Sequence, residues 1–263
     1  MNISSYDRQY HAAAEGGEQV GVADSDPVGG ADTGRKHRII KYRGSNHHVD
    51  APMATTRNTA SLDLDSVAAA SNIMLLAPSL GTAGSRVCGE LLSMEQPSEE
   101  NVLAVLLNDA PDDWLDEWQR TVGPERPANT CFVTAGEQMR SASTGAATGS
   151  VLPGDMTVHP VSSPSDLTGL GMRISRQLSD WADDDSRIVV DFDSLTTLLE
   201  YAPRESVFKF MHVLKGRIDA ADAVAHYHMD PAAHDTKEIS TFKSLMDAVV
   251  EIDDDGTCSV SSR

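Results

Sequence analysis

Residues 72–92 read NIMLLAPSLGTAGSRVCGELL and place three kinds of segment in a fixed order. A short apolar run, Ile73–Leu76, ends at Ala77-Pro78. Small residues follow, and apolar residues then return at helical spacing as far as Leu92. A strand, a small-residue loop and a helix in this order are typical of a phosphate-binding loop. Because the loop contains no lysine, the stretch predicts either a nucleotide site or the remnant of one.

The same alternation of buried strand and amphipathic helix continues to the end of the chain. It predicts an α/β fold of three layers, with helices on both faces of a mainly parallel sheet. The chain is expected to end in a β-hairpin, and the Gly/Ser/Thr-rich residues 135–155 are expected to form a long loop. The expected strands are 72–76, 101–107, 130–134, 156–161, 187–192, 223–227, 248–252 and 257–261. The expected helices are 61–67, 85–93, 110–122, 165–182, one that follows Ser194, 206–218 and 237–246.

The composition is strongly acidic: 40 Asp and Glu residues against 21 Lys and Arg give a net charge of -19 over 263 residues. Aromatic residues make up only 5% of the chain, and small residues are abundant. This combination predicts a cytoplasmic protein adapted to high salt, where screening removes most of the self-repulsion. The alternative is an ordinary acidic protein, or one with disordered acidic segments.

Residues 1–52 differ from residues 53–263, and this difference predicts two regions. The first region holds six Lys or Arg and seven Asp or Glu, net -1, so the remaining 15 and 33 place -18 on the second. The leader is interpreted as a disordered tail, as a basic arm for nucleic acid built on Arg35–His48, or as sequence upstream of a true start at Met53. Residues 53–263 are expected to form one α/β domain.

The three cysteines, Cys88, Cys131 and Cys258, are too few and too scattered for a disulfide framework or a zinc knuckle. The first two lie in apolar sequence and are expected to be small core residues in a reducing compartment. No apolar run approaches the ~20 residues of a membrane span, and no signal peptide is evident. We therefore expect no membrane partner.

A second signal lies in residues 187–201, RIVVDFDSLTTLLEY, where a buried strand ends at Asp193-Ser194 and a helix follows. A carboxylate at the carboxyl end of a central strand faces the crevice where α/β sheets bind ligands, and it can hold magnesium. The alternative is that Asp193-Ser194 only caps the next helix.

Five segments together resemble the RecA/KaiC-like superfamily, and most closely the haloarchaeal KaiC-like, transducer-like proteins. They are NIMLLAPSLGTAG, RIVVDFDSLTTLLEY, ESVFKFMHVLKGRI, AVAHYHMDPAAHD and FKSLMDAVVEI, and the resemblance extends from about residue 62 to the C-terminus. It implies a nucleotide site in which a G-x-x-x-x-G-K-[ST] loop binds phosphate and magnesium.

This chain departs from that motif at all four defining positions. Ala77 and Thr82 stand at the two glycines, Ala83 at the lysine and Gly84 at the magnesium-binding Ser/Thr. The family's water-activating Glu has only a displaced Asp109 in its place. ATP hydrolysis is therefore not expected. The resemblance implies a vestigial nucleotide site, for which the candidate residues are Ser79, Gly81, Thr82, Ala83, Gly84, Ser85, Asp193 and Ser194.

Histidines form a further group of candidates. His226 and His228 share one face of an expected strand, and His234-Asp235 follow after a turn. With a carboxylate they have the composition of a zinc site. The interpretation preferred from sequence is that they satisfy local backbone groups, and no metal ligand is assigned.

Three functions remain open on the sequence alone. The first is a non-catalytic regulatory or protein-interaction domain that docks a partner protein or self-associates, with no cofactor. Its candidate contact surfaces are helix 165–182 and the Trp114/Trp118 region, which are core residues in the alternative interpretation. The second is an ATP or ADP sensor that binds Mg-ATP without efficient hydrolysis. The third, disfavoured by the acidic body, is a DNA-associated protein that uses the basic leader.

Overall fold

Uninterrupted apolar runs form the centre of one nine-stranded sheet. β1 (Asn72–Leu76) and β2 (Glu100–Leu106) are buried at every position, and β6 (Arg187–Asp193) and β7 (Val224–Met229) are buried along most of their length. The computed structural model describes residues 62, 64–78, 82–135, 150–152, 156–253 and 255–262. All of these lie within one unit, Thr55–Arg263, so the predicted leader falls outside the described residues.

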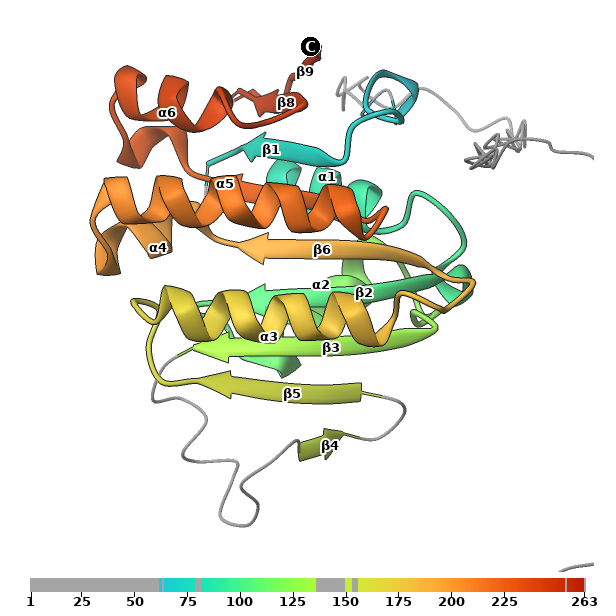
Figure 1. The fold of residues 1–263 in the computed structure, drawn as a ribbon. Helices are drawn as coiled ribbons and strands as arrows, with labels where there is room; N and C mark the ends of the chain where they lie inside the picture. Colours follow the sequence, from blue (N-terminus) through green and yellow to red (C-terminus); the bar gives the residue numbers. More distant parts are fainter. Residues whose placement is uncertain are drawn as a thin grey trace, which may run out of the picture. The chain divides into compact units, whose positions relative to one another are not determined.

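The sheet is parallel except at its two edges. Its strand order is β4-β5-β3-β2-β6-β7-β1-β8-β9 (Figure 1). β4 pairs antiparallel with β5 and β9 antiparallel with β8, whereas the strands between them are parallel neighbours. The remaining strands are β3 (Asn129–Ala135), β4 (Ser150–Leu152), β5 (Met156–Val161), β8 (Ala248–Ile252) and β9 (Cys258–Ser262).

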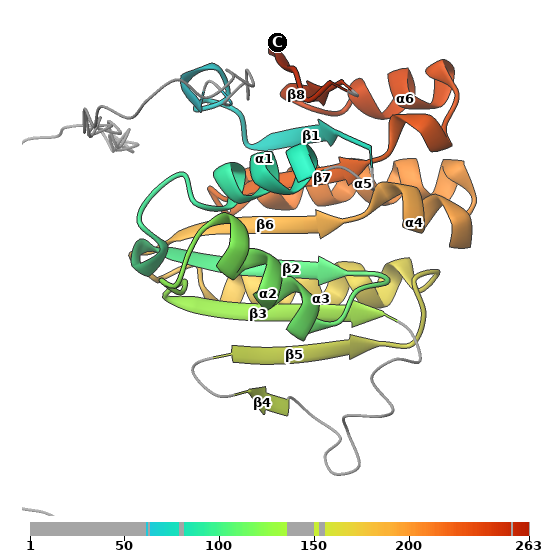
Figure 2. The same ribbon diagram turned by 180° about the vertical axis from the view of Figure 1, so that it is seen from behind.

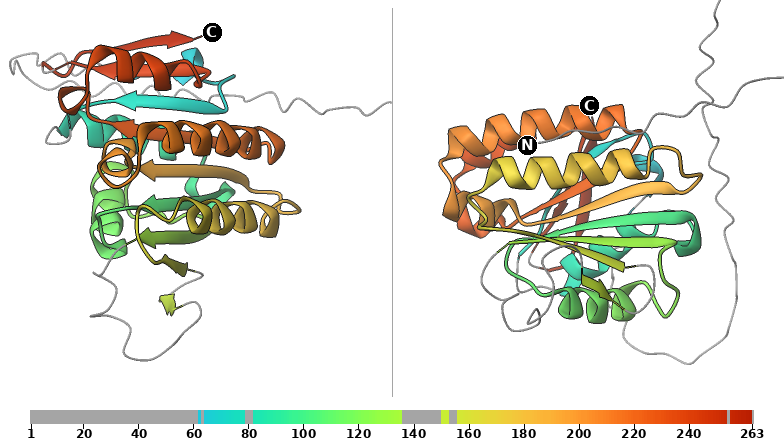
Figure 3. Two further views of the ribbon diagram at one scale, coloured as in Figure 1. Left: turned by 60° about the vertical axis from the view of Figure 1, so that its left-hand side comes forward. Right: turned by 60° about the horizontal axis from the view of Figure 1, so that its bottom comes forward.

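Helices cover both faces of this sheet. α3 (Leu167–Asp180), α4 (Leu195–Tyr201) and α5 (Arg204–Ala220) lie on one face, and α1 (Thr82–Leu92) and α2 (Pro111–Thr121) lie on the other (Figure 2). The right-hand view of Figure 3 shows the sheet between the two layers. The largest core cluster lies under α3 to α5 and includes Phe242 of α6 (Thr236–Lys243). The predicted three-layer, mainly parallel α/β sheet with a C-terminal hairpin is confirmed.

Polar residues cap the first turns of three helices, as their sequences indicate. Asp166, Ser194 and Asp235 each accept a backbone N–H from the first turn of the helix that follows, at 2.7 to 3.1 Å. Gly256 has a φ of 81° in the turn between β8 and β9, a conformation that glycine adopts without a steric penalty.

Three predicted elements differ from the structure. The helix expected at 85–93 begins earlier, at Thr82, because small residues are compatible with a first helical turn. Of the helix expected at 61–67, the described residues form only a 3-10 turn, Leu64–Ser66. The expected loop 135–155 contains β4, which exists by pairing with β5, a long-range contact that the local pattern does not encode.

The tryptophan pair of α2 belongs to the core. Trp114 and Trp118 are only 8% and 4% exposed, and Trp114 packs edge-on against Phe132 of β3. The interpretation of this pair as a contact surface is therefore wrong, and the core alternative is confirmed. Among the helices in the described part of the chain, none has the length and apolar character needed to cross a membrane.

Candidate functional site

A pocket of about 320 Å³ opens at the carboxyl edge of the sheet between α1 and α2. β1, β6 and β7 each contribute a residue near their carboxyl end, and the loops after β1 and β2 contribute Pro78 and Asp109. Side chains of both helices close the two sides. The pocket lies where open α/β sheets bind their ligands.

Polar side chains reach this pocket because two neighbouring strands carry them on the same face. On β6, Asp191 and Asp193 are two residues apart, and on β7 so are His226 and His228. Asp191 and His226 are direct partners in the parallel register. The two strands therefore present two acid–histidine pairs toward the α1/α2 face.

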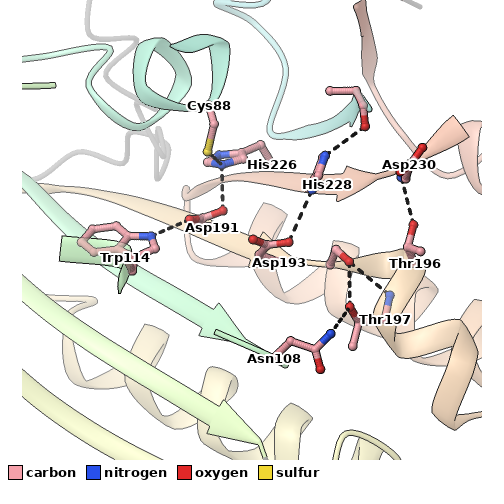
Figure 4. Close-up of polar contacts among 12 residues, drawn as sticks. Cys88, Asn108, Trp114, Asp191, Asp193, Thr196, Thr197, His226, His228 and Asp230 are labelled. Atoms are coloured by element: carbon pink, nitrogen blue, oxygen red, sulfur yellow. Dashed lines mark hydrogen bonds and ion pairs between the residues drawn. The ribbon is translucent and has the colours of Figure 1, made fainter. Parts of the chain in front are cut away.

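The first pair lies deep and is joined by a cysteine from α1. His226 Nε2 lies 2.9 Å from Asp191 Oδ1 and 3.3 Å from Cys88 Sγ. The indole N–H of Trp114 donates to Asp191 Oδ2 at 2.7 Å. Figure 4 shows these four side chains converging from α1, α2, β6 and β7. His226 is fully buried and Asp191 is 3% exposed, whereas Cys88 is half-buried and faces the pocket.

The second pair lies nearer the opening. His228 Nδ1 is 3.4 Å from Asp193 Oδ1, and its Nε2 is 3.2 Å from the carbonyl oxygen of Ala77 (Figure 4). Burial lowers the pKa of His228, but the hydrogen bond and charge of Asp193 outweigh burial and leave that pKa raised. Burial, followed by the charge of Asp193, raises the pKa of Asp109 across the opening.

Burial and neighbouring charges also shift the pKa values of Cys88 and Asp191 in the deep cluster of Cys88, Trp114, Asp191 and His226. Burial raises the pKa of the Cys88 thiol well above its usual value, and the charges of Asp191 and Asp193 raise it further. Burial alone would raise the pKa of Asp191, but His226 and the Trp114 N–H together hold it below its usual value. These two shifts favour a neutral thiol beside an ionised carboxylate.

The geometry does not support a cysteine–histidine–aspartate nucleophile. In such a triad the acid binds one ring nitrogen of histidine and the nucleophile binds the other. Here Asp191 and Cys88 both approach Nε2, while Nδ1 is buried and has no partner among the described residues. A raised thiol pKa also disfavours the thiolate that attack would need.

The residues predicted for a vestigial nucleotide site separate into three groups. Gly84, Ser85 and Asp193 line the pocket, whereas Thr82, Ala83 and Ser194 are not among its lining residues. Ser194 caps α4 through Thr197 N–H, as the capping alternative predicts, and Ala83 packs with the cluster of β1, β8 and α1. Ser79 and Gly81 lie outside the described residues.

The close approach of α1 and α2 at the pocket depends on Gly89. A Cβ atom at this position would lie 2.7 Å from Thr121 Cβ and 2.8 Å from its Oγ1. Gly89→Ala is therefore expected to destabilise the fold by about 1–2 kcal/mol, because the overlap outweighs the gain of about 1 kcal/mol in helix propensity. Urea unfolding measures the change.

Substitutions at Thr121 provide the matched controls for that measurement. Thr121→Gly removes both overlapping atoms and is expected to restore most of the lost stability in the Gly89→Ala background. Thr121→Ala keeps the Cβ and is expected to restore less. Equal rescue by both would assign the overlap to Oγ1 alone, and no rescue by either would show that Thr121 does not cause the loss of stability.

The comparisons with known proteins concern the same region. The model of a protein family described as a family of unknown function, DUF7504, matches residues 70–252. The chain belongs to this family. The DUF7504 region starts just before β1 and ends with β8, so it contains every residue that lines the pocket. A search of curated proteins returned no match.

Solved structures with a similar fold are distant in sequence. One is an uncharacterized protein from Pyrococcus horikoshii, PH0321, in complex with an unknown peptide, with a TM-score of 0.49 and 11% identity over 70% of this chain and 77% of that one. Another is PH0250 from Pyrococcus horikoshii OT3, with a TM-score of 0.46 and 10% identity over 73% of this chain and 86% of that one.

Sequence reasoning missed the deep cluster of the DUF7504 chain. From sequence, Cys88 is expected to be a core residue and Asp191 is not a candidate. Trp114 is considered only as part of a contact surface, and His226 only together with His228, His234 and Asp235 as the composition of a zinc site. The sequence signal for this cluster is Asp-x-Asp on one buried strand and His-x-His on another. Two acids or two histidines on one face of a buried strand are not needed for an apolar core, so they indicate a site. The adjacency of β6 and β7 was the missing information. His234, grouped with them in sequence, instead contacts Glu238 and Thr196.

Proposed function

We propose that this DUF7504 chain is a non-catalytic, RecA/KaiC-like regulatory or protein-interaction domain whose nucleotide site has lost its phosphate-binding residues. The charge of the pocket at the carboxyl edge carries the proposal. Five carboxylates line it, from Asp109, Asp113, Glu117, Asp191 and Asp193.

The cations near this pocket do little to offset those carboxylates. His228, whose pKa is raised, pairs with Asp193. Arg120 lines the pocket but pairs with Glu117 at 2.5 Å. Arg86, the cation nearest the loop in sequence, instead pairs with Glu90 on α1. A triphosphate would meet five carboxylates and no lysine among the residues that the structure describes in this pocket. Anion binding is therefore electrostatically disfavoured, although Gly84 and Ser85 of the first turn of α1 also line the pocket.

A groove on the opposite helical layer offers a place for a partner. It lies between α3 and α5, which cover the same face of the sheet (Figure 1). It has a volume of about 610 Å³ and exposes Met172 and Val213 by 69% and 59%. The lining contains the cations Arg176, Lys209 and Arg217 and, among the described residues, no carboxylate. Lys209 pairs with Glu205 at 2.7 Å and Arg176 with Asp180 at 3.7 Å, but these pairs are exposed and weak, so the groove remains more cationic than its surroundings. On a chain of net charge -19, a cationic apolar groove favours an amphipathic segment of a partner protein that carries carboxylates beside its apolar residues.

Calorimetry with Mg-ATP and Mg-ADP on the full chain in molar potassium chloride tests the loss of the nucleotide site. We expect no binding up to millimolar nucleotide. Micromolar binding that Asp193→Asn abolishes would contradict the proposal and support the alternative, an ATP or ADP sensor without efficient hydrolysis.

Two synthetic helical peptides with the same leucine stripe test the groove, one flanked by glutamates and the other by lysines. The acidic peptide is expected to bind at least about tenfold more tightly, because the groove is cationic. Met172→Glu with Val213→Glu should remove that binding, and Tyr201→Glu, at a residue that is 50% exposed outside the groove, should not. Equal binding of both peptides would contradict the proposed partner chemistry.

Light scattering on the same variants separates a partner protein from a second copy. If the wild-type chain is oligomeric and Met172→Glu with Val213→Glu makes it monomeric, the groove is filled by another copy of this chain. The proposed heterologous partner would then be wrong, although the chain would still be an interaction domain.

A further inference from the structure

The deep cluster at the base of the pocket has the donor atoms of a metal centre. Cys88 Sγ, Asp191 Oδ1 and His226 Nε2 lie within 4.8 Å of one another. Thiolate, imidazole and carboxylate are the three side-chain ligands that Zn²⁺ uses. The donors come from α1, β6 and β7, so the fold and not a local sequence motif brings them together.

We propose that Cys88, Asp191 and His226 bind one Zn²⁺ ion, with a fourth coordination position that opens into the pocket. The convergence of all three donors on one point distinguishes this arrangement from an ordinary histidine–aspartate pair. The same ring nitrogen, Nε2, faces both Sγ and Oδ1. A single Nε2–H cannot point well at both atoms, whereas a cation in that position can contact all three.

The observed distances need only small adjustments to hold zinc. Zinc bond lengths of about 2.3 Å to sulfur and 2.0–2.2 Å to nitrogen and oxygen place tetrahedral S and N about 3.6 Å apart, and N and O about 3.4 Å apart. The observed separations are 3.3 Å and 2.9 Å. Opening each by a few tenths of an ångström around the ion is within side-chain freedom, since Cys88 is only half-buried.

The surroundings supply support for the ligands and a route of entry. Trp114 N–H binds Asp191 Oδ2, so Oδ1, which faces His226 Nε2, is the oxygen that would bind the ion. Cys88 and Asp191 line the pocket, so an ion and a fourth ligand such as water can reach them from solvent. The further carboxylates of the pocket, including Asp193 and Glu117, favour the entry of a divalent cation.

The test uses the untagged full chain, stripped with a chelator and titrated with Zn²⁺ against a chromophoric competitor and, separately, with Co²⁺. We expect one equivalent of Zn²⁺ to bind and to raise Tm. Co²⁺ should give the near-ultraviolet thiolate-to-cobalt charge-transfer band and the visible bands of a tetrahedral site. Absence of binding by both ions at millimolar concentration would overturn the proposal.

Variants assign the ligands. Cys88→Ser should abolish the charge-transfer band, and His226→Gln and Asp191→Asn should each weaken Zn²⁺ binding at least about tenfold. Cys258→Ser and His228→Gln are matched controls of the same chemistry that should leave binding unchanged. If Cys88→Ser keeps the band, or if His228→Gln removes it, the proposed ligand set is wrong.

Trp114→Phe tests the site even if substitution of a ligand prevents folding. Trp114→Phe removes only the N–H that orients Asp191 and retains the aromatic contact with Phe132. It should weaken Zn²⁺ binding roughly tenfold while the charge-transfer band persists. A purely structural tryptophan would instead lower Tm equally with and without Zn²⁺ and leave the affinity unchanged, which would count against the site.

Discussion

Glu100→Gln is expected to raise the free energy of unfolding by on the order of 3 kcal/mol at pH 8, because it removes a carboxyl group that the fold holds in its neutral form. Glu100 begins β2 and is completely buried. Its Oε1 accepts the N–H of Glu95 at 3.0 Å, while its Oε2 has no partner in the described part of the protein. Burial raises the pKa of this carboxyl to about 8, although the charge of Arg187 on β6 partly opposes the rise.

The sign of the pH dependence follows from that raised pKa. The unfolded chain releases the Glu100 proton near pH 4.5, whereas the folded protein keeps it until about pH 8. Stability is therefore lost as pH rises through this window, with a slope that approaches about 1.4 kcal/mol per pH unit, and it levels off above the window. Glutamine is isosteric with the neutral acid and does not titrate, so the variant should lose this slope.

Urea unfolding at constant ionic strength across this pH range measures the effect. The control is Glu99→Gln, which removes the same charge at the neighbouring, exposed position. It should leave most of the slope in place, because the charge of Glu99 is the smallest of the contributions that raise the pKa of Glu100. Parallel profiles for the wild type and Glu100→Gln would show that Glu100 is ionised in the folded protein.

The strands of the sheet were largely predictable from the sequence because most of them are recognisable as local apolar patterns. β1, β2 and β6 are short continuous apolar runs with turn-forming residues near their ends, and a buried parallel strand requires such a run. The strand order was not available from these patterns. β7 lies between β6 and β1, although it is the seventh strand along the chain. That choice depends on long-range packing, which no local window contains.

The candidate site was less predictable for the same reason. The carboxylate at the end of β6 follows from position alone, and Asp193 does line the pocket. Cys88 sits in a helix among small and apolar residues, so its sequence context is that of a core residue. Its distance of 3.3 Å from His226, which is 138 residues further along the chain, depends on how α1 crosses the sheet. The loop after β1 suggests a phosphate site at the carboxyl edge of the sheet. The acidic character of the pocket instead comes largely from side chains outside that loop, such as Asp191 and Asp193 of β6.

Asn72→Ala is expected to destabilise the protein by about 2–4 kcal/mol, through a buried network at the amino end of β1. Asn72 Oδ1 accepts the hydroxyl hydrogen of Tyr227 at 2.9 Å, and its Nδ2 donates to Asp219 Oδ1 at 2.8 Å. Its backbone N–H donates to Asp247 Oδ2 at 3.0 Å. One side chain and its backbone therefore connect β1 with β7, α5 and the residue before β8.

The cost is large because the substitution leaves a buried donor without an acceptor. Asn72 and Tyr227 are both completely buried. Burial, followed by the charges of Asp219 and Asp247, holds the pKa of Tyr227 far above its usual value, so its hydroxyl stays protonated and needs an acceptor. An orphaned buried hydroxyl costs about 1–3 kcal/mol, to which truncation of the asparagine adds a small cavity.

A double-mutant cycle separates the hydrogen bond from the loss of packing. Tyr227→Phe alone should cost about 1–2 kcal/mol, and the double variant should cost less than the sum of the two single variants, because removing the hydroxyl also removes the orphaned donor. Asn108→Ala, at an exposed asparagine that also bonds to a side chain, should change stability by no more than about 0.5 kcal/mol. Additive costs in the cycle would mean that Asn72 stabilises the fold through its carboxylate partners, and that the hydroxyl finds another acceptor once Asn72 is truncated.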